Sequence, residues 1–267
     1  VFNESAKIIK TGGERRSAHI AIMNIDHPDI EEFITVKRGS LNNELTQFNI
    51  SVGITDAFMK AVEDDTDWNL QWGGKVYKTV KARDLYDLLV KNAYEHNEPG
   101  VFFLDTVERY NNGYWAFKMD RTNPCREICM PSYSLCCLAS LNLIRFVRNP
   151  FTPEAHFDWQ QFRESIRIAI RFLDNVLDVT DYPLEKIKKF SEQWRRVGLG
   201  DAFAMLGVVY GSDASLRVAD MLGKTLRDES YRMSTLLADE KGSFPAFDKK
   251  KIMEATFIKG LPEDIQN

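Results

Sequence analysis

The chain has 267 residues, of which 44% are hydrophobic and 28% charged, values typical of a globular protein with a substantial core. Its 35 basic and 39 acidic residues give a net charge of −4, which excludes a general attraction to nucleic acid or anionic lipid. No apolar run approaches the roughly 20 residues of a membrane span, and no signal peptide is recognisable. We expect a cytoplasmic protein of one domain, or at most two. The missing initiator methionine suggests part of a longer protein.

The first part of the chain alternates between strand-like and helix-like stretches. Three pairs are predicted: strand 18–25 with helix 26–38, strand 47–54 with helix 55–64, and helix 81–97 with strand 101–107. Asp26 and Thr55 are candidate N-caps of the first two helices. This alternation predicts an α/β architecture with a largely buried sheet.

The second half of the chain is predicted to be mostly helical. Residues 158–179 carry an apolar face at helical spacing, and two further helices fit residues 200–209 and 214–241. These helices have the pattern of packing walls, so we expect most of the chemistry earlier in the chain.

All four cysteines lie within one short stretch, at positions 125, 129, 136 and 137. A zinc site is one reading, but a single pair has suitable spacing and the stretch contains no histidine. Apolar packing suits Cys129 and Cys137. Cys125 differs, because Asn123 lies two residues before it and Glu127 two residues after it. A thiol with an amide and a carboxylate so close in sequence is a candidate reactive centre.

Two segments here resemble a known family. "NPCREI", followed by "CCLASLNL", resembles the radical-cysteine loop of the ribonucleotide reductases, with Asn-x-Cys-x-Glu and then Cys-x-Leu-x-x-x-Asn-Leu. Further segments resemble that family in the same order: "TGGERRSAHIAIMNIDHPDIEEFITVKR", "FNISVGITDAFMKAV", "PGVFFLDTVERYN", "RFLDNVLDV", "VGLG" and "EKGSFPAFD". "HPDIEEFI" and "FNISVGITDAFM" are most similar to the adenosylcobalamin-dependent, class II group. The resemblance covers nearly the whole chain.

The resemblance implies a fold and a set of catalytic roles. Residues 1–267 would be the central portion of a single catalytic domain, a ten-stranded α/β barrel incomplete at both ends, with a radical-cysteine finger loop and a helical second half. Cys125 matches the thiyl-radical position, which takes the 3′ hydrogen of the ribose. Glu127 matches the carboxylate that takes the 3′-hydroxyl proton, and Asn123 matches the amide that binds the ribose.

Cys136 matches one of the two thiols that reduce the radical intermediate and end as a disulfide. Aligning Leu138 and Asn142 with the motif selects Cys136 over Cys137. In the family the second thiol lies on an earlier strand, whereas this chain has no cysteine before Cys125. A thioredoxin- or glutaredoxin-type reductant is the implied partner.

The segment "TGGERRSA" is a second candidate site. Glycines allow close backbone approach and arginines bind phosphate, although Gly-Gly with basic neighbours is more often a turn before a strand. In the family this segment passes the identity of a dNTP or ATP effector to the substrate site. Gly12, Gly13, Arg15 and Arg16 thereby become binding candidates.

The implied function is thiyl-radical reduction of ribonucleoside di- or triphosphates to deoxyribonucleotides for DNA synthesis, by a homodimer that uses adenosylcobalamin. A separate metal-containing subunit is the alternative radical source. Other readings are a noncatalytic or split fragment that acts by assembly with another chain, and a zinc-binding module. Because substrate-phosphate and thiol-reloading segments are missing, we expect these 267 residues alone to be inactive. Arg126 stands where many members have glycine, which predicts altered loop packing.

Overall fold

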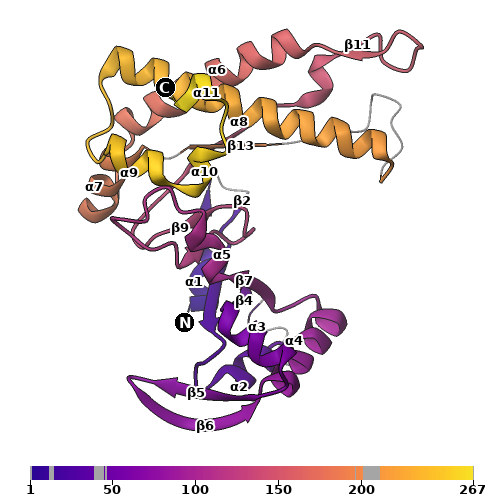
Figure 1. The fold of residues 1–267 in the computed structure, drawn as a ribbon, viewed down its shortest axis with the longest axis vertical. Helices are drawn as coiled ribbons and strands as arrows, with labels where there is room; N and C mark the ends of the chain where they lie inside the picture. The colour runs from indigo at the N-terminus through magenta and orange to yellow at the C-terminus, as the bar shows by residue number, and fades with distance from the viewer. Residues whose placement is uncertain are drawn as a thin grey trace. The chain divides into compact units, whose positions relative to one another are not determined.

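The computed structural model describes residues 2–11, 15–38, 45, 47–195, 197–200 and 211–266. The chain divides into two compact units, Val1–Ser132 and Tyr133–Asn267. Figure 1 traces its helices and strands in chain order. Across the described ranges, no helix combines the length and the apolar character needed to cross a membrane. Strands and helices are mixed in both units, which confirms the α/β class.

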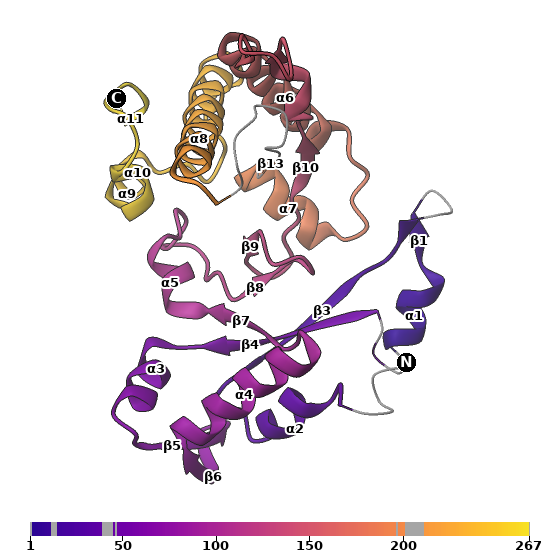
Figure 2. The ribbon, with the colours of Figure 1, turned by 90° about the vertical axis from the view of Figure 1, so that its right-hand side faces the viewer.

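A parallel sheet forms the centre of the first unit. Its strands lie in the order β3 (His19–Asn24), β4 (Phe48–Ile54) and β7 (Gly100–Phe103), and every pairing is parallel. Three helices cover one face of this sheet, namely α2 (Ile30–Thr35), α3 (Asp56–Glu63) and α4 (Ala82–His96) (Figure 2). The predicted alternation of strands and helices is confirmed. Among the residues that the structure describes, the strands do not close into a barrel.

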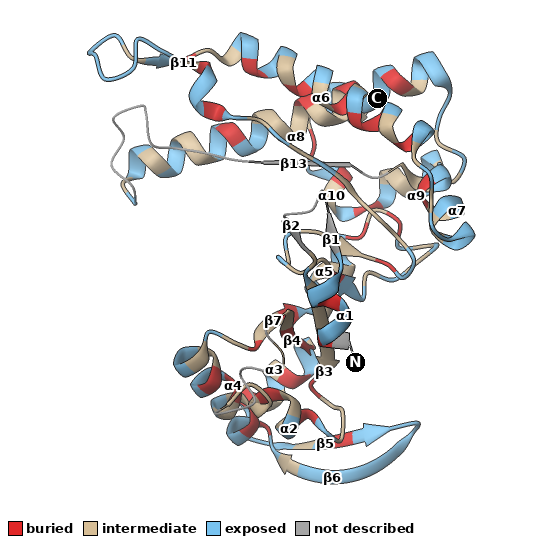
Figure 3. Cartoon of the chain, turned by 180° about the vertical axis from the view of Figure 1, so that it is seen from behind, coloured by how far each residue is buried: buried red, intermediate tan, exposed pale blue. Residues whose placement is uncertain are grey.

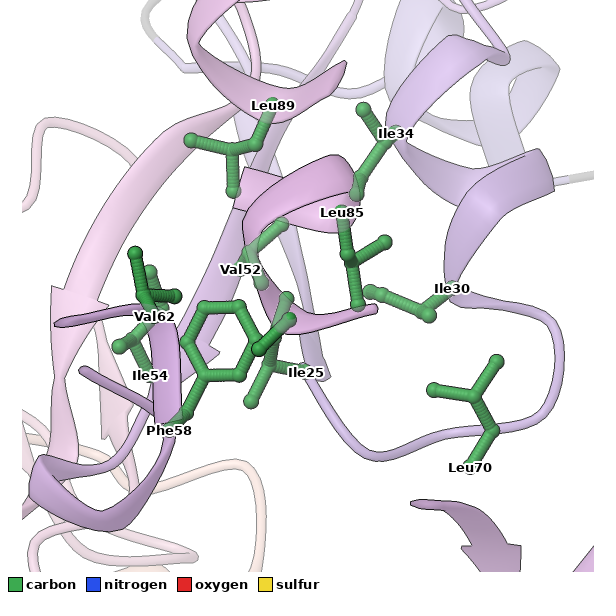
Figure 4. Close-up of a cluster of buried hydrophobic side chains, with 11 residues drawn as sticks. Ile25, Ile30, Ile34, Val52, Ile54, Phe58, Val62, Leu70, Leu85 and Leu89 are labelled. Carbon is green, nitrogen blue, oxygen red and sulfur yellow. The ribbon is translucent and has the colours of Figure 1, made fainter. Parts of the chain in front are cut away.

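The core of the first unit lies between the sheet and these helices. Phe58 is fully buried and is surrounded by aliphatic side chains of β4 and all three helices (Figure 4). Val52 and Ile54 of β4 point into this cluster. Because successive side chains of a strand alternate between faces, Asn49, Ser51 and Gly53 lie on the opposite face of the sheet.

That opposite face is built from small residues near its centre. Gly100 pairs in register with Ser51, so the two share this face, and the Ser51 side chain is completely buried. We call Asn49, Ser51, Gly53 and Gly100 the loop-bearing face. Their small side chains leave room for a chain segment to lie directly on the strands. Figure 2 shows the hairpin of β8 (Arg121–Thr122) and β9 (Cys129–Met130) on this side.

The helix boundaries show one cap that was predicted correctly and one that was not. Thr55 Oγ1 accepts a hydrogen bond from Phe58 N at 3.2 Å, which confirms it as the cap of α3. The helix predicted from Asp26 instead begins at Ile30. Asp26 instead binds a distant segment of the first unit, because its carbonyl oxygen accepts from Gln71 N at 2.6 Å. Its prediction as a cap was therefore wrong.

Two further elements differ from the sequence prediction. The strand expected over residues 101–107 ends at Phe103 and is followed by α5 (Leu104–Arg109). Residues near 70, for which the sequence predicts no element, form an antiparallel hairpin of β5 (Asp67–Trp72) and β6 (Lys75–Lys81). Trp68 of this hairpin donates from Nε1 to the carbonyl oxygen of Ile25 at 3.3 Å.

The second unit is mainly helical, as predicted. Its long helices are α6 (Trp159–Val179), α7 (Glu185–Trp194) and α8 (Asp213–Lys241), and α6 packs against α8. Figure 3 shows buried residues along both α6 and α8. The core contains an aromatic group of Phe146, Phe157 and Phe162. The helix predicted over 200–209 lies outside the described residues, except that Gly200 ends a strand.

Shorter elements complete the two units. In the first unit they are α1 (Phe2–Ile8), β1 (Lys10–Thr11) and β2 (Arg15–Arg16). In the second they are β10 (Cys137–Ser140), the 3-10 helix η2 (Leu143–Phe146), β11 (Val147–Arg148), β12 (His156–Phe157), β13 (Val197–Gly200), α9 (Lys249–Glu254), α10 (Thr256–Lys259) and α11 (Glu263–Gln266). β10 and β13 are parallel, with Cys137 opposite Val197.

Candidate active site

A short antiparallel hairpin carries the candidate reactive thiol. Thr122 of β8 pairs with Cys129 of β9, and residues 123–128 form the tip between them. Arg126 N donates to the carbonyl oxygen of Asn123 at 2.9 Å, which closes a turn around Cys125. At the base of the tip, Thr122 Oγ1 donates to the carbonyl oxygen of Ile128 at 3.0 Å. The tip is therefore closed by its own hydrogen bonds.

Asn123 and Glu127 are in direct contact across this tip. Asn123 Nδ2 donates to Glu127 Oε1 at 2.6 Å. The other end of the same amide, Oδ1, accepts from Ile128 N at 3.1 Å. Thr122 Oγ1 lies 3.3 Å from this oxygen, but its single hydroxyl hydrogen is directed to the nearer carbonyl oxygen of Ile128. Because its oxygen accepts from the backbone N–H of Ile128, the amide is oriented with its nitrogen toward the carboxylate.

Cys125 is exposed at the tip of the hairpin, between the two residues of this pair in sequence. The structure thus brings together the three first-unit residues that the sequence singled out as catalytic. A thiol, a carboxylate and an amide in one loop supply a hydrogen-atom donor, a proton acceptor and a hydrogen-bond donor.

Both sequence neighbours of Cys125 are bound to strand β4. On one side, Asn49 Nδ2 donates to the carbonyl oxygen of Pro124 at 2.7 Å. On the other, Arg126 Nη2 donates to the carbonyl oxygen of Ile50 at 3.1 Å. The sequence predicts Asn49 only as part of the strand over residues 47–54. Its polar side chain on the face opposite the core was the available signal.

An ion cluster lies beside the second of these contacts. Glu98 Oε1 accepts from Ile50 N at 3.1 Å and lies 3.6 Å from Arg126 Nη2. The other carboxylate oxygen of Glu98 pairs with Lys37, and both of these side chains are mostly buried. The charge of Glu98 is therefore compensated by two cations where it lies against the sheet.

Cys136 and Cys137, from the second segment of the motif, belong to the second unit. Cys136 immediately precedes β10 in the second unit, and its Sγ lies 3.6 Å from the carbonyl oxygen of Cys137. Burial raises the pKa of the Cys137 thiol, which favours its protonated, less nucleophilic form. Asn142 of the same motif caps η2, because its Oδ1 accepts from Ile144 N at 3.3 Å.

The predicted effector segment is described in part. β1 and β2 pair antiparallel, with Lys10 opposite Arg16 and Thr11 opposite Arg15. Gly12 and Gly13 lie outside the described residues. Nucleotide binding by this segment therefore stays a prediction.

Histidine and cysteine side chains are common metal ligands. Within the described parts of the chain, no group of three or more His, Cys, Asp or Glu side chains is arranged to hold a metal ion. His27 instead serves a local structural role, because its Nδ1 accepts from Asp29 N at 3.1 Å. No described arrangement supports the zinc-binding alternative.

Residues 1–263 match the family model described as ribonucleotide reductase, barrel domain, and the chain belongs to this family. It is 36% identical over 254 residues to a protein of Mycobacterium tuberculosis named vitamin B12-dependent ribonucleoside-diphosphate reductase, covering 92% of this chain and 36% of the relative. A protein of the same name from Thermoplasma acidophilum is also 36% identical, over 92% of this chain and 32% of its own length. The vitamin B12-dependent ribonucleotide reductase of Streptomyces coelicolor is 29% identical over 91% of this chain and 28% of its own length. The chain thus spans about a third of the length of these relatives.

Proposed function

We propose that the protein is the catalytic chain of a ribonucleotide reductase, which replaces the 2′-hydroxyl of a ribonucleotide with hydrogen. One observation carries the proposal: an exposed thiol, Cys125, lies on a hairpin tip that also holds the bonded pair Asn123 and Glu127. Membership of the ribonucleotide reductase barrel-domain family supports it.

In the proposed reaction, Cys125 acts as a thiyl radical that takes the 3′ hydrogen atom of the ribose. Glu127 accepts the proton of the 3′-hydroxyl, and the 2′-hydroxyl leaves as water after it is protonated. Two thiols supply the two electrons and end as a disulfide, and Cys125 returns the hydrogen atom to the 3′ carbon. The balance is one ribonucleotide and one dithiol converted to one deoxyribonucleotide, one disulfide and one water.

The hydrogen bond between Asn123 and Glu127 gives this scheme a physical basis. The amide fixes the carboxylate within the loop, so that a ribose hydroxyl bound by one group lies within reach of the other. The bond from Ile128 N to Asn123 Oδ1 keeps the amide in that orientation. A substrate would therefore meet groups that are already in place, which reduces the cost of ordering them.

We assign Cys136 to the reducing pair, since the neighbouring Cys137 is biased toward its protonated form by burial. The second thiol must come from outside these 267 residues if it precedes Cys125, because the chain has no cysteine there. A thioredoxin- or glutaredoxin-type protein would restore the dithiol by exchange.

Adenosylcobalamin is the proposed radical source, because the relatives from Mycobacterium tuberculosis and Thermoplasma acidophilum are named vitamin B12-dependent. When bound, it supplies an organic radical able to take the hydrogen atom of a thiol. The exposed position of Cys125 fits such a group, since its sulfur can be reached from outside the loop. Of the described residues, Cys125 is the one that we assign to meet it. A separate metal-containing subunit is the alternative source.

We further propose that the strands belong to a ten-stranded α/β barrel with the Cys125 hairpin as its finger loop. The three-stranded parallel sheet supports this, because helices cover one face and the hairpin is anchored to the other. Gly12, Gly13, Arg15 and Arg16 would carry effector binding by dNTPs or ATP, and the working enzyme would be a homodimer in the cytoplasm.

The test is product formation by the full-length protein, supplied with a dithiol and ribonucleoside di- or triphosphates, with and without adenosylcobalamin. We expect deoxyribonucleotide only when the cobalamin is present. Reduction that is indifferent to cobalamin and requires a separate metal subunit would overturn the cofactor assignment. No reduction with either radical source would favour a noncatalytic chain that acts by assembly.

A further inference from the structure

Arg126, the residue that follows Cys125, makes contacts outside its own loop. We propose that Arg126 is a positioning residue, whose guanidinium clamps the Cys125 hairpin tip onto β4 and thereby fixes the thiol for hydrogen-atom transfer. The clamp itself rests on geometry alone. Its catalytic consequence rests on the proposed function.

The backbone of Arg126 adopts a conformation that favours glycine. Its φ is +70°, in the left-handed region where a side chain with a Cβ is strained. An arginine at this position must offset that strain with contacts of its side chain. Three such contacts are present, to the carbonyl oxygen of Ile50, to Glu98 and to Gly100.

Gly100 provides the space for the guanidinium on the loop-bearing face. A Cβ added to Gly100 would lie 2.5 Å from Arg126 Cζ and 2.7 Å from Nη1, closer than any ordinary contact. The planar group therefore lies directly against the backbone of β7. This close approach is specific to the pair, since any side chain at position 100 would displace the guanidinium.

The hydrogen-bond and charge partners of the clamp are themselves held in place. Glu98 Oε1 accepts from Ile50 N, while Ile50 O accepts from Arg126, so the guanidinium and the carboxylate bind the two ends of one residue of β4. Lys37 holds the second oxygen of Glu98. The guanidinium thus meets a carboxylate that cannot swing away without breaking two other contacts.

The clamp and the Asn49 contact lie on opposite sides of the thiol. Asn49 binds the carbonyl oxygen of Pro124, the residue before Cys125, and Arg126 follows it. The two anchors involve adjacent residues of β4, Asn49 and Ile50. Because the backbone on either side of Cys125 is tied to the same strand, the position of the thiol relative to the sheet is fixed.

The first test measures amide hydrogen exchange in the full-length protein. Arg126→Gly removes the clamp while suiting the φ of +70°, so we expect the variant to fold. Exchange of the backbone amides of Asn123 and of residues 125–128 should rise about tenfold, with exchange in the three-stranded sheet unchanged. Arg121→Ala is the matched control, because Arg121 lies in the same hairpin but bonds at an exposed position to Ser132. Unchanged loop exchange in Arg126→Gly would overturn the clamp.

A double-mutant cycle tests the contact from the opposite side. Gly100→Ala should displace the guanidinium and raise exchange of the same amides. In an Arg126→Gly background, Gly100→Ala should cause no further rise in amide exchange, because its effect acts through the side chain of Arg126, which this background lacks. Independent, additive effects of the two substitutions would contradict the proposed contact.

The third test measures the consequence for ribonucleotide reduction. Arg126→Gly should lower kcat about tenfold to hundredfold, with KM within about twofold, because a displaced thiol slows hydrogen transfer rather than binding. The isotope effect of 3′-deuterated substrate should increase, and Arg126→Lys should recover part of kcat. An unchanged kcat and isotope effect in a variant with a loosened loop would overturn the positioning role. If the wild-type protein reduces no ribonucleotide, the proposed function fails, and the exchange measurements still decide the clamp.

Discussion

Asn123 and Glu127 are joined by a hydrogen bond of 2.6 Å, from Nδ2 to Oε1, across the tip of the hairpin that presents Cys125. The amide cannot turn its oxygen toward the carboxylate without losing the hydrogen bond from Ile128 N. A carboxylate held in this way remains an acceptor at a fixed place in the loop, which suits the proton-acceptor role that we propose for Glu127.

The first prediction separates the chemistry of Glu127 from its structural contact. In Glu127→Gln, the new side-chain oxygen can still accept from Asn123, so the loop should keep its shape while the proton acceptor is lost. We expect kcat for ribonucleotide reduction to fall by about 10² to 10⁴, with an unchanged melting temperature. Glu63→Gln, at an exposed position of α3, is the control and should retain full activity. More than half of the wild-type kcat in Glu127→Gln would exclude the assigned role.

A second prediction concerns the adjacent thiols Cys136 and Cys137. Because burial raises the pKa of Cys137, its thiol should react slowly with a disulfide at neutral pH. Cys136→Ser should abolish turnover driven by a dithiol reductant, whereas Cys137→Ser should keep at least about half of it. The measurement is the rate of deoxyribonucleotide formation over many turnovers in the full-length protein. The opposite ranking of the two variants would move the redox role to Cys137.

The second unit contains a charge network that should govern its stability. Asp174 of α6 is mostly buried and accepts from Arg195 Nε at 2.6 Å and Lys241 Nζ at 2.8 Å, which links α6 to the ends of α7 and α8. Arg195 and Lys241 also bind Asp178. We expect Asp174→Asn to lower the free energy of unfolding by about 2 kcal/mol, since both cations keep one partner.

Urea unfolding followed by tryptophan fluorescence measures this loss. Asp220→Asn is the matched control, because its pair with Lys224 is exposed on α8 and should contribute less than about 0.5 kcal/mol. Equal losses of unfolding free energy in Asp174→Asn and Asp220→Asn would show that burial of the Asp174 network adds no stability.

The same network predicts a pH dependence on the acid side. Burial tends to raise the pKa of Asp174, but the hydrogen bonds from Arg195 and Lys241 outweigh it and hold the pKa below its ordinary value. Arg195 likewise lowers the pKa of Asp178. A depressed folded-state pKa stabilises the protein above the unfolded value of about 3.9, and this stability is lost as pH falls through the folded-state pKa. Between about pH 5 and 3, Asp174→Asn should therefore lose stability less steeply than the wild type. If the unfolding free energies of the two proteins fell in parallel over this pH range, the lowered pKa of Asp174 would be contradicted.

The fold was predicted where the pattern of apolar residues is strong. The isoleucine-rich strands β3 and β4 and the long amphipathic helix α6 were recognised because their apolar residues form a compact run or recur at helical spacing. The β5–β6 hairpin was missed because most of its side chains are exposed and polar. Its turn at Gly73 and Gly74, both with positive φ, was the signal that a sequence reading could have used.

The site residues likewise divide into those that the sequence predicted and those that it did not. Asn123, Cys125 and Glu127 were found because their spacing is local and resembles a family motif. Arg126 was expected only to alter loop packing, since its partners Ile50 and Glu98 precede it by many residues. Contacts of that kind depend on the parallel register of β4 and β7, which sequence patterns do not specify.

Substitution of single cysteines in the full-length protein tests the central claim most directly. Deoxyribonucleotide formation should be compared in the wild type, Cys125→Ser and Cys129→Ser, each with adenosylcobalamin and a dithiol. Because a hydroxyl hydrogen is much harder to remove than a thiol hydrogen, we predict no detectable product from Cys125→Ser. Cys129 lies in the hairpin stem and is partly buried, so Cys129→Ser should stay within about threefold of the wild type. Product formed by Cys125→Ser at a rate near that of Cys129→Ser would contradict the assignment of Cys125 as the radical thiol.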